Sequence, residues 1–597
     1  MLRFIMSRGP DDSGVYRQDI AGHSAAILHS RLSIIDLTER AKQPMLDSGS
    51  DWVISYNGEI FNYLELRQEL IALGHSFCSD SDTEVLLKAW VEWGQDALPR
   101  LNGMFAFCVF NRQTGQAWLV RDRYGVKPLL WGRTEAGVVF SSSVAGVAAS
   151  INASVDIDYC ARGLRYKTFE LPESGAPFLQ VQSVPPGSWV KMEISARGVD
   201  ITDGCWYDLK EAVSARRARM ESSTDEQLLE ECRHILEDSV RLRLRSDVPL
   251  AVSLSGGLDS STVSALASRH VSNLCGFTYG SSDAVSSEGP IVAAFSQSTG
   301  INAQFVWPEY GADELDDLLE RTFAFQEAPF GGLSVLAQNE VFREVRLKGF
   351  KVLLGGQGGD EAFAGYRKFF VVALRDALNR HDPLSAIRYM WSLGLMLLHE
   401  VGQAQLYWRG LNRYTDPGSF QFKLIDWHPQ SINLWGQGSS LESRQIEDVQ
   451  RWSIPSLLRY EDRNSMGHGL ETRLPFMDYR LMEFALALPA RLKIAKGFGK
   501  WALRRVGQGM VPDFIRLNRK KRGFDVTQSW VKCGIGASLR RRILDNKSAL
   551  SGYLKPNIDQ LLSDTALVED SRLVDEALML AWLTEPVREQ ARWRVGE

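Results

Sequence analysis

The chain has 597 residues, which is too long for one hydrophobic core, so two domains are expected. Its 44% hydrophobic and 24% charged residues are ordinary for a globular protein, and a formal net charge of -5 gives no reason to expect a nucleic-acid or membrane partner. The seven cysteines lack metal-site spacing, and their odd number favours a reducing, cytoplasmic location. No secretory signal is visible, and the most apolar stretch, 390–398, is too short to cross a bilayer.

Short apolar segments and helical patterns alternate over the first 210 residues. Trp52–Tyr56 and Phe105–Phe110 are predicted to be strands, and Tyr63–Leu73 and Thr83–Trp93 are predicted to be helices. This pattern predicts a first domain of mixed α and β structure.

Four polar strings stand in this first region. They are Arg8–Gly14, Arg31–Asp36, Asn57–Ile60 and Ser81–Glu84. Taken singly, each has a structural explanation: Asn-Gly at 57–58 is typical of a hairpin turn, and the aspartate at 82 could cap a helix. Only the ordered set indicates function.

From residue 249 to about 366, predicted strands and helices alternate after an amphipathic helix over Thr224–Arg245. The strands are Leu250–Leu254, Leu274–Tyr279, Ala303–Trp307 and Lys351–Leu354, and the helices between them are Asp259–Ser268, Pro290–Gln297 and Glu314–Phe323. This alternation predicts a doubly wound parallel sheet, in which ligands bind beyond the carboxyl ends of the strands.

Two glycine-rich loops fall at those strand ends. Residues 253–261 read Ser-Leu-Ser-Gly-Gly-Leu-Asp-Ser-Ser, and residues 355–361 read Gly-Gly-Gln-Gly-Gly-Asp-Glu. Glycines between a strand and a helix let backbone N–H groups approach an anion, most simply a phosphate. A tight turn would explain a lone Gly-Gly equally well, and neither the Gly-Lys-Ser/Thr of a Walker loop nor a Gly-x-Gly-x-x-Gly fingerprint is present.

The string at 255–261 resembles the pyrophosphate loop of ATP-pyrophosphatases, and the whole set of strings resembles the asparagine synthetase B family of glutamine-dependent amidotransferases. The match continues through 462–466, 471–478, 499–504 and 521–524. The resemblance implies an α/β protein. An N-terminal-nucleophile (class II glutaminase) αββα domain would cover 1–210, and an ATP-pyrophosphatase domain with a doubly wound parallel sheet and a helical C-terminal part would cover 225–597.

The resemblance also implies site residues. Catalytic roles would fall to Asn57, Gly58, Lys500 and Gln357. Glutamine would be bound by Arg31, Ile34, Ile35, Asn57, Gly58, Glu59 and Asp82, with Asn57 and the Gly58 N–H forming an oxyanion hole. ATP would be bound by Ser253, Ser255, Gly256, Gly257, Asp259, Ser260, Tyr279, Gly355 and Gly356. Asp259 and Asp360 would hold Mg²⁺ as hard oxygen ligands.

One part of the family pattern is absent. The family begins Met-Cys-Gly, and that cysteine becomes the N-terminal nucleophile, whereas position 2 here is Leu2 and the nearest cysteine along the chain is Cys78. Met1–Ser7 resembles the end of the helix before Arg-Gly-Pro-Asp, so the first strand is expected to be missing. A start site assigned too far downstream and a true loss of glutaminase activity both explain this, and the retained Arg31, Asn57 and Asp82 favour the first.

The resemblance implies an ATP-dependent amidotransferase. Glutamine-derived ammonia would pass through an internal channel to an acyl-adenylate. Two alternatives are a glutaminase-dead cyclase of the β-lactam synthetase or lasso-peptide cyclase type and a catalytically silent paralogue. The resemblance implies the asparagine synthase (glutamine-hydrolysing) reaction, but Gln357, Gly355 and the segment 326–332 depart from the family pattern, so amidation of a sugar acid or natural-product acid is a further alternative. The sequence leaves open whether the chain forms a homodimer.

Overall fold

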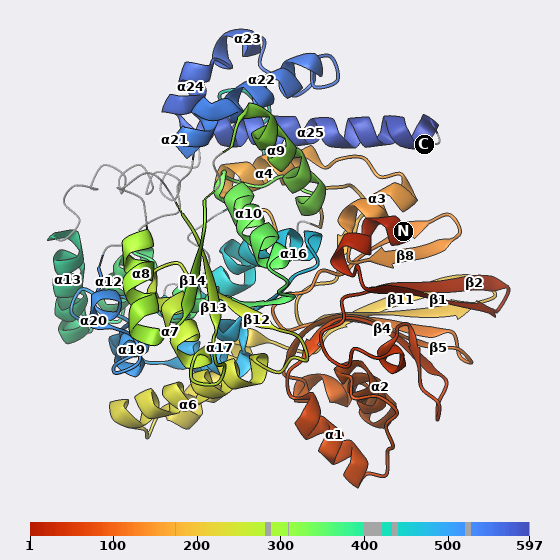
Figure 1. The fold of residues 1–597 in the computed structure, drawn as a ribbon, viewed down its shortest axis with the longest axis horizontal. Coiled ribbons are helices and arrows are strands. Elements are labelled where there is room, and N and C mark those ends of the chain that lie inside the picture. Colours follow the sequence, from red (N-terminus) through yellow and green to blue (C-terminus); the bar gives the residue numbers. More distant parts are fainter. Residues whose placement is uncertain are drawn as a thin grey trace.

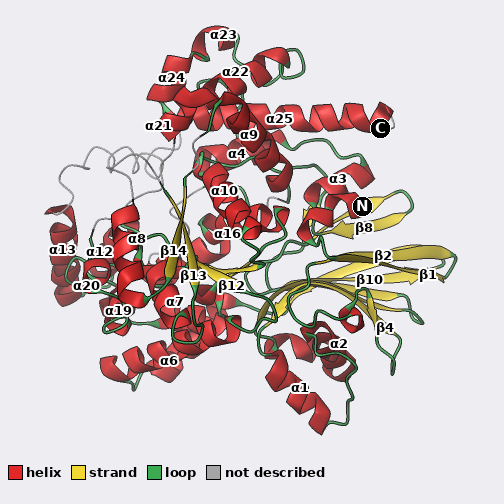
Figure 2. Ribbon diagram, in the orientation of Figure 1, coloured by secondary structure: helices red, strands yellow, loops and turns green. Residues whose placement is uncertain are grey.

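The computed structural model describes residues 1–172, 175–280, 288–307, 310–398, 421–430, 432, 440–519 and 527–595. The motif segment 521–524 lies outside the described residues. The described chain forms an N-terminal part built on antiparallel sheets and a larger C-terminal part built around one parallel sheet (Figures 1 and 2). The α/β fold expected from the sequence is confirmed.

The largest sheet of the N-terminal part has six strands in the order β11-β10-β6-β5-β4-β3. Its strands are β3 (Met45–Leu46), β4 (Trp52–Ile60), β5 (Gly103–Asn111), β6 (Gln116–Arg121), β10 (Ser188–Ser195) and β11 (Gly198–Cys205). The central strand β5 is an unbroken apolar run and is buried over nearly its whole length. Its antiparallel register with β4 pairs Cys108 with Ser55.

Two smaller antiparallel sheets complete this part, with orders β1-β2 and β8-β7-β9. Their strands are β1 (Asp12–Ile20), β2 (His23–Arg31), β7 (Leu130–Thr134), β8 (Gly137–Ser141) and β9 (Gln182–Ser183). The associated helices are α1 (Tyr63–Ala72), α2 (Asp82–Trp93), α3 (Val144–Ile151) and α4 (Ile157–Tyr166). Figure 1 shows α1 and α2 beyond the large sheet, on the side away from β8.

The C-terminal part contains a parallel five-stranded sheet in the order β14-β13-β12-β15-β16. The strands are β12 (Leu250–Ser253), β13 (Cys275–Tyr279), β14 (Asn302–Val306), β15 (Val352–Leu354) and β16 (Glu471–Arg473). The first four were predicted from their apolar runs. The polar strand β16 was not predicted. In Figure 1, helices α7 and α8 lie on one side of this sheet, and α10 and α16 lie on the other.

Helices form most of the remaining chain. The helices up to β15 are α5 (Leu209–Met220), α6 (Asp225–Arg243), α7 (Leu258–Ala267), α8 (Gly289–Thr299), α9 (Ala312–Gln326) and α10 (Ser334–Leu347). Those from β15 to α16 are α11 (Gly359–Ala362), α12 (Lys368–Asn379), α13 (Pro383–Leu398), α15 (Leu441–Glu447) and α16 (Ile454–Gly467). Later helices are α17 (Tyr479–Ala487), α18 (Ala490–Lys493), α19 (Trp501–Val506), α20 (Asp513–Arg516), α21 (Thr527–Trp530), α22 (Gly536–Asp545), α23 (Ile558–Leu561), α24 (Asp564–Glu569) and α25 (Ser571–Val595).

Buried charged residues join the two parts. Arg8 donates two hydrogen bonds to the carboxylate of Asp462, with N···O distances of 2.8 and 3.2 Å. The fully buried Arg473 lies 3.0 Å from Glu59 of β4 and 2.8 Å from Glu471 of β16. These partners explain how a strand as polar as β16 is buried, because each buried charge has an opposite charge within reach. Among the described helices, none is both long and apolar enough to cross a membrane.

Candidate functional site

A cavity of about 940 Å³ opens at the carboxyl ends of the parallel strands. Every residue assigned to ATP in the sequence analysis lines it: Ser253, Ser255, Gly256, Gly257, Asp259, Ser260, Tyr279, Gly355 and Gly356. Gln357, Asp360 and Lys500 line it as well. The fold therefore brings the two glycine-rich loops and the distant lysine segment to one cavity, which we call the nucleotide pocket.

The first loop turns sharply from β12 into α7. Gly256 has a φ of +59°, a conformation that L side chains rarely adopt, and Gly257 is the residue before the first helical turn. The Ser255 and Ser260 hydroxyls lie 2.8 Å apart, and the Ser255 N–H donates to the Ser260 hydroxyl at 3.3 Å. The loop thus presents hydroxyls and the positive end of α7 to the pocket, as an anion site requires.

The second loop packs directly on the first. A Cβ on Gly356 would lie 2.7 Å from the backbone nitrogen of Ser260, so no larger residue fits there. A Cβ on Gly365 would lie 2.1 Å from an oxygen of Asp360 and from the Cε of Lys500. These glycines are therefore required because the loops and the lysine approach one another closely.

Lys500 lies between the two aspartates. It precedes α19 in a left-handed conformation with φ +53°, and its buried ammonium contacts Asp259 and lies 2.8 Å from Asp360. Burial alone would lower the pKa of Lys500, but the adjacent charges of Asp259 and Asp360 raise it. The lysine is therefore a permanent cation in the nucleotide pocket.

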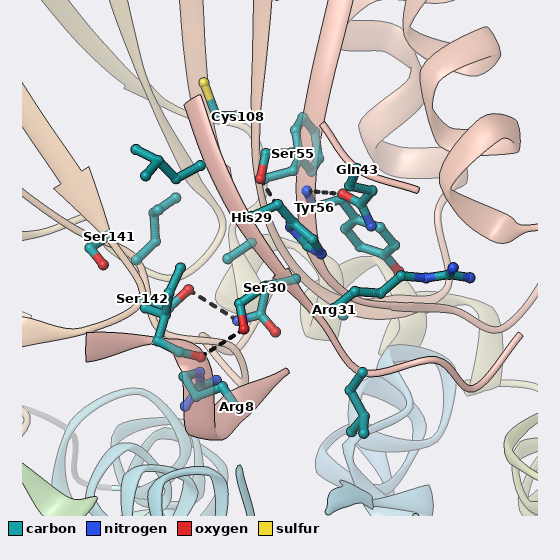
Figure 3. A pocket seen from close by; sticks show the side chains of 18 of the residues that line it. Arg8, His29, Ser30, Arg31, Gln43, Ser55, Tyr56, Cys108, Ser141 and Ser142 are labelled. Atoms are coloured by element: carbon teal, nitrogen blue, oxygen red, sulfur yellow. Dashed lines mark hydrogen bonds between the residues drawn. The ribbon is translucent and has the colours of Figure 1, made fainter. Parts of the chain in front are cut away.

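A second cavity, of about 270 Å³, lies in the N-terminal part between β2, β4 and β8 (Figure 3). It is lined by all seven residues assigned to glutamine, namely Arg31, Ile34, Ile35, Asn57, Gly58, Glu59 and Asp82. Met466 and Glu471 of the C-terminal part also reach it. We call this cavity the amide pocket.

Asp82 begins α2 and is buried in the amide pocket. Its carboxylate accepts hydrogen bonds from the Tyr56 hydroxyl at 2.8 Å and the Ile60 N–H at 3.0 Å. Burial raises the pKa of Asp82 to about 6, because these neutral donors offset only part of the desolvation. The Arg31 guanidinium donates to the backbone carbonyls of Asp36 and Thr38. Among the described residues, neither Asp82 nor Arg31 forms an ion pair.

Asn57 and Gly58 lie on β4 at the edge of the same pocket. The Asn57 side-chain amide donates to the Ser142 hydroxyl at 3.3 Å. Gly58 has a φ of +149°, and a Cβ there would lie 2.0 Å from the carbonyl oxygen of Met104. Only glycine fits this position. A ligand in the pocket can therefore approach the Gly58 backbone without meeting a side chain.

The thiol nearest the amide pocket is that of Cys108, which sequence reasoning missed. Cys108 lines the pocket from β5, opposite Ser55, whereas Cys78 is exposed and does not line the pocket. Burial raises the pKa of Cys108 to about 12, so at neutral pH it is a thiol and a poor nucleophile. His29 lines the same pocket with its Nδ1 3.2 Å from the Ser55 hydroxyl, and burial lowers the pKa of His29 to about 4 (Figure 3).

Helix α16 reaches both pockets, and the sequence analysis singled out only its segment 462–466. Its residues Leu457, Tyr460 and Glu461 line the nucleotide pocket, and Met466 lines the amide pocket. A third, smaller cavity along its length is lined by Arg459 and Asp462. Leu457, Tyr460 and Glu461 carry no local sequence signal. The residues around Glu461 come from α10 and from the second glycine-rich loop.

Both parts of the chain are similar to known protein families. Residues 231–592 match the family described as Asparagine synthase, and residues 1–206 match the Glutamine amidotransferase domain. Asparagine synthetase [glutamine-hydrolyzing] 1 of Bacillus subtilis (strain 168) is 30% identical, over 94% of this chain and 89% of that protein. A putative asparagine synthetase [glutamine-hydrolyzing] of Mycobacterium tuberculosis (strain ATCC 25618 / H37Rv) is 30% identical, over 88% of this chain and 83% of that protein.

Proposed function

This chain belongs to the asparagine synthase family, and from that premise we propose that it is an ATP-dependent amidotransferase. It activates a carboxylate with ATP, releases pyrophosphate, and replaces AMP with ammonia to form an amide. The observation that carries the proposal is the meeting of Asp259, Asp360 and Lys500 at the nucleotide pocket. A carboxylate pair on two glycine-rich loops, with a lysine between them, suits phosphoryl chemistry better than any purely structural role.

The donor set fits Mg²⁺. Asp259 and Asp360 direct carboxylate oxygens at one cation position, which the Lys500 ammonium takes up in this structure. Hard carboxylate oxygens are the ligands that Mg²⁺ prefers, with phosphate oxygens and water completing the shell. We propose that these two aspartates hold Mg²⁺, which would neutralise charge on the pyrophosphate leaving group. Lys500 would then turn to the α-phosphate and stabilise the charge that develops there.

The amide pocket suits glutamine. An ionised Asp82 and an unpaired Arg31 provide opposite charges for the ammonium and carboxylate of an amino acid. Asn57 and the Gly58 N–H would stabilise the oxyanion formed at the amide carbon. Hydrolysis also needs a nucleophile. Cys108 lines the pocket, but its thiol is protonated at neutral pH and is a poor nucleophile.

The test is to identify the products of ATP turnover. The chain, ATP, MgCl₂, ammonium chloride and a carboxylate panel beginning with L-aspartate are mixed, and AMP and pyrophosphate are quantified. ATP–pyrophosphate exchange that depends on a carboxylate is the expected result. Formation of ADP and phosphate instead, or no ATP turnover with any acceptor, would contradict the proposal and favour a silent paralogue.

Two further proposals concern the location of the protein in the cell and its oligomeric state. The seven cysteines are free in the structure, which supports a reducing cytoplasm as the location. A homodimer is the oligomeric state we propose to test, by light scattering at several protein concentrations.

A further inference from the structure

Glu461 is a buried carboxyl group in the wall of the nucleotide pocket. Its Oε2 accepts a 2.6 Å hydrogen bond from the side-chain amide of Gln338 on α10. Its Oε1 faces Gly355, where a Cβ would lie 3.5 Å away, and no described residue donates a hydrogen bond to it. One carboxyl oxygen is therefore fixed, and the other is available to a small molecule in the pocket.

A chain of amides holds this carboxyl group in place. The Gln338 carbonyl oxygen accepts from the Asn464 amide at 3.2 Å, and the Asn464 carbonyl oxygen accepts from the Gln326 amide at 2.8 Å. These hydrogen bonds set which end of Gln338 points at Glu461, so the donor always faces the carboxyl group. The arrangement preorganises Glu461 without giving it a cationic partner.

The position of Glu461 along α16 links it to the amide pocket. Met466, five residues further along the helix, lines that second cavity, and five residues of α-helix span about 7.5 Å. Glu461 is thus the acidic residue of α16 that lines the nucleotide pocket, on the same helix whose Met466 lines the amide pocket. Ammonia crossing between the pockets beside this helix would meet its carboxyl group on entry.

The other acidic residues of the nucleotide pocket are arranged differently. Asp259 and Asp360 contact Lys500, and Glu288 lies beside Gly256 at the phosphate loop. Gln357 is an amide and has no useful basicity. Glu461 is the pocket carboxyl that is set apart from the cation and the phosphate loop.

We propose that Glu461 is a catalytic base that accepts a proton from ammonia as it attacks the acyl-adenylate, a role that rests on the proposed function above. The nitrogen lone pair forms the C–N bond, and the bond from carbon to the AMP oxygen breaks, its electron pair leaving with AMP. One N–H proton passes to the Glu461 carboxylate and then to solvent. No oxidant or further reactant is needed.

The electrostatics of the site suit this role. Burial, together with the neighbouring Asp462, raises the pKa of Glu461 to about 7. A base with a pKa near the working pH is the most effective proton acceptor. From α10 the group is faced by the neutral Gln338, and from the second loop by the backbone of Gly355. On α16 the flanking Asp462 pairs with Arg8, and Arg463 pairs with Glu327.

The test compares two nucleophiles in Glu461→Gln. Ammonium must lose one proton before it can attack and a second as it attacks, whereas hydroxylamine is already unprotonated at neutral pH and, as the more reactive nucleophile, depends less on a base. With the first acceptor that supports AMP formation by the unmodified chain, amide formation from ammonium should fall about 100-fold or more, in the range of general base catalysis. Hydroxamate formation should change less than about threefold, and raising the pH should partly restore amide formation because it supplies free ammonia.

Further variants separate this role from a structural one. In Glu461→Gln/Gln357→Glu a carboxylate returns to the same pocket from the second glycine-rich loop, and about tenfold recovery of the ammonium rate is expected. Equal losses with both nucleophiles, or no loss with either, would overturn the proposal. If the unmodified chain forms no AMP with any acceptor, the proposed function itself fails and this inference falls with it. Normal pyrophosphate exchange with a loss confined to ammonium is the result that supports both.

Discussion

The two pockets of this chain differ in how their charged side chains are paired. In the nucleotide pocket, Asp259 and Asp360 are already neutralised by Lys500. In the amide pocket, Asp82 is held only by a hydroxyl and an N–H, and Arg31 only by carbonyls. Under the proposed function, entry of a metal nucleotide would replace the Lys500 ammonium by a metal ion in the first pocket. In the second, the ammonium and carboxylate of an amino acid would pair with Asp82 and Arg31.

This difference indicates which groups each pocket requires for its proposed reaction. The nucleotide pocket has its carboxylates, its lysine and its tightly packed glycines in contact, so its chemistry depends on groups already present. The amide pocket has binding groups and an oxyanion site, but the thiol that lines it is the protonated Cys108. Four experiments test this difference between the two pockets.

The largest effect is expected from the aspartates of the nucleotide pocket. Asp259→Asn or Asp360→Asn removes a carboxylate that would hold the metal, which costs several kcal/mol of transition-state stabilisation and lowers pyrophosphate exchange about 10³-fold or more. Lys500→Ala should act similarly. Asp313→Asn, on the exposed first turn of α9, is the matched control and should exchange normally. Near-normal exchange in any of the three site variants would remove that residue from the catalytic set.

The next effect concerns the nitrogen source. This chain should form amide faster from ammonium chloride than from glutamine, because burial keeps Cys108, which lines the amide pocket, in its protonated thiol form. AMP formation is measured with each nitrogen source at saturating ATP. Comparable rates with glutamine and ammonium would show that a nucleophile has been overlooked. A commercial glutaminase added to the glutamine reaction is the positive control, since it supplies ammonia in solution.

Binding of glutamine should depend on pH even without hydrolysis. The buried Asp82 has a pKa of about 6, so its carboxylate, and with it the attraction to the glutamine ammonium, is lost as the pH falls through 6. Calorimetric titration should give about tenfold weaker glutamine binding at pH 5 than at pH 7. Asp82→Asn should bind weakly at both pH values. Unchanged affinity in the unmodified chain would mean that Asp82 does not contact the ammonium group.

The sequence predicted the elements whose signals are local. The apolar runs of β5 and β12 and the glycine-rich loops were recognisable because burial and tight turns dictate composition. Strand β16 was not recognisable, since Glu471 and Arg473 are polar and are buried only because their partners come from distant segments. Glu461 was missed for the same reason. Its environment is made by Gln338 and Gly355, each more than a hundred residues away.

The smallest effect is expected for the choice of acceptor, which concerns the wall of the nucleotide pocket formed by Gln357. Gln357 departs from the acidic residue of the family pattern, and it lines the same cavity as Glu461. Exchanging a carboxylate for an amide changes which acceptor is favoured, by about 1–2 kcal/mol, or roughly tenfold. We therefore expect UDP-glucuronate or a similar sugar acid to support AMP formation at least as well as L-aspartate. The variant Gln357→Glu should shift the ratio of kcat/KM values toward aspartate about tenfold or less, with Gln297→Glu, at an exposed position of α8, as the control. Efficient turnover of aspartate by the unmodified chain would return it to ordinary asparagine synthesis, because the amide at 357 would then have no effect on the acceptor.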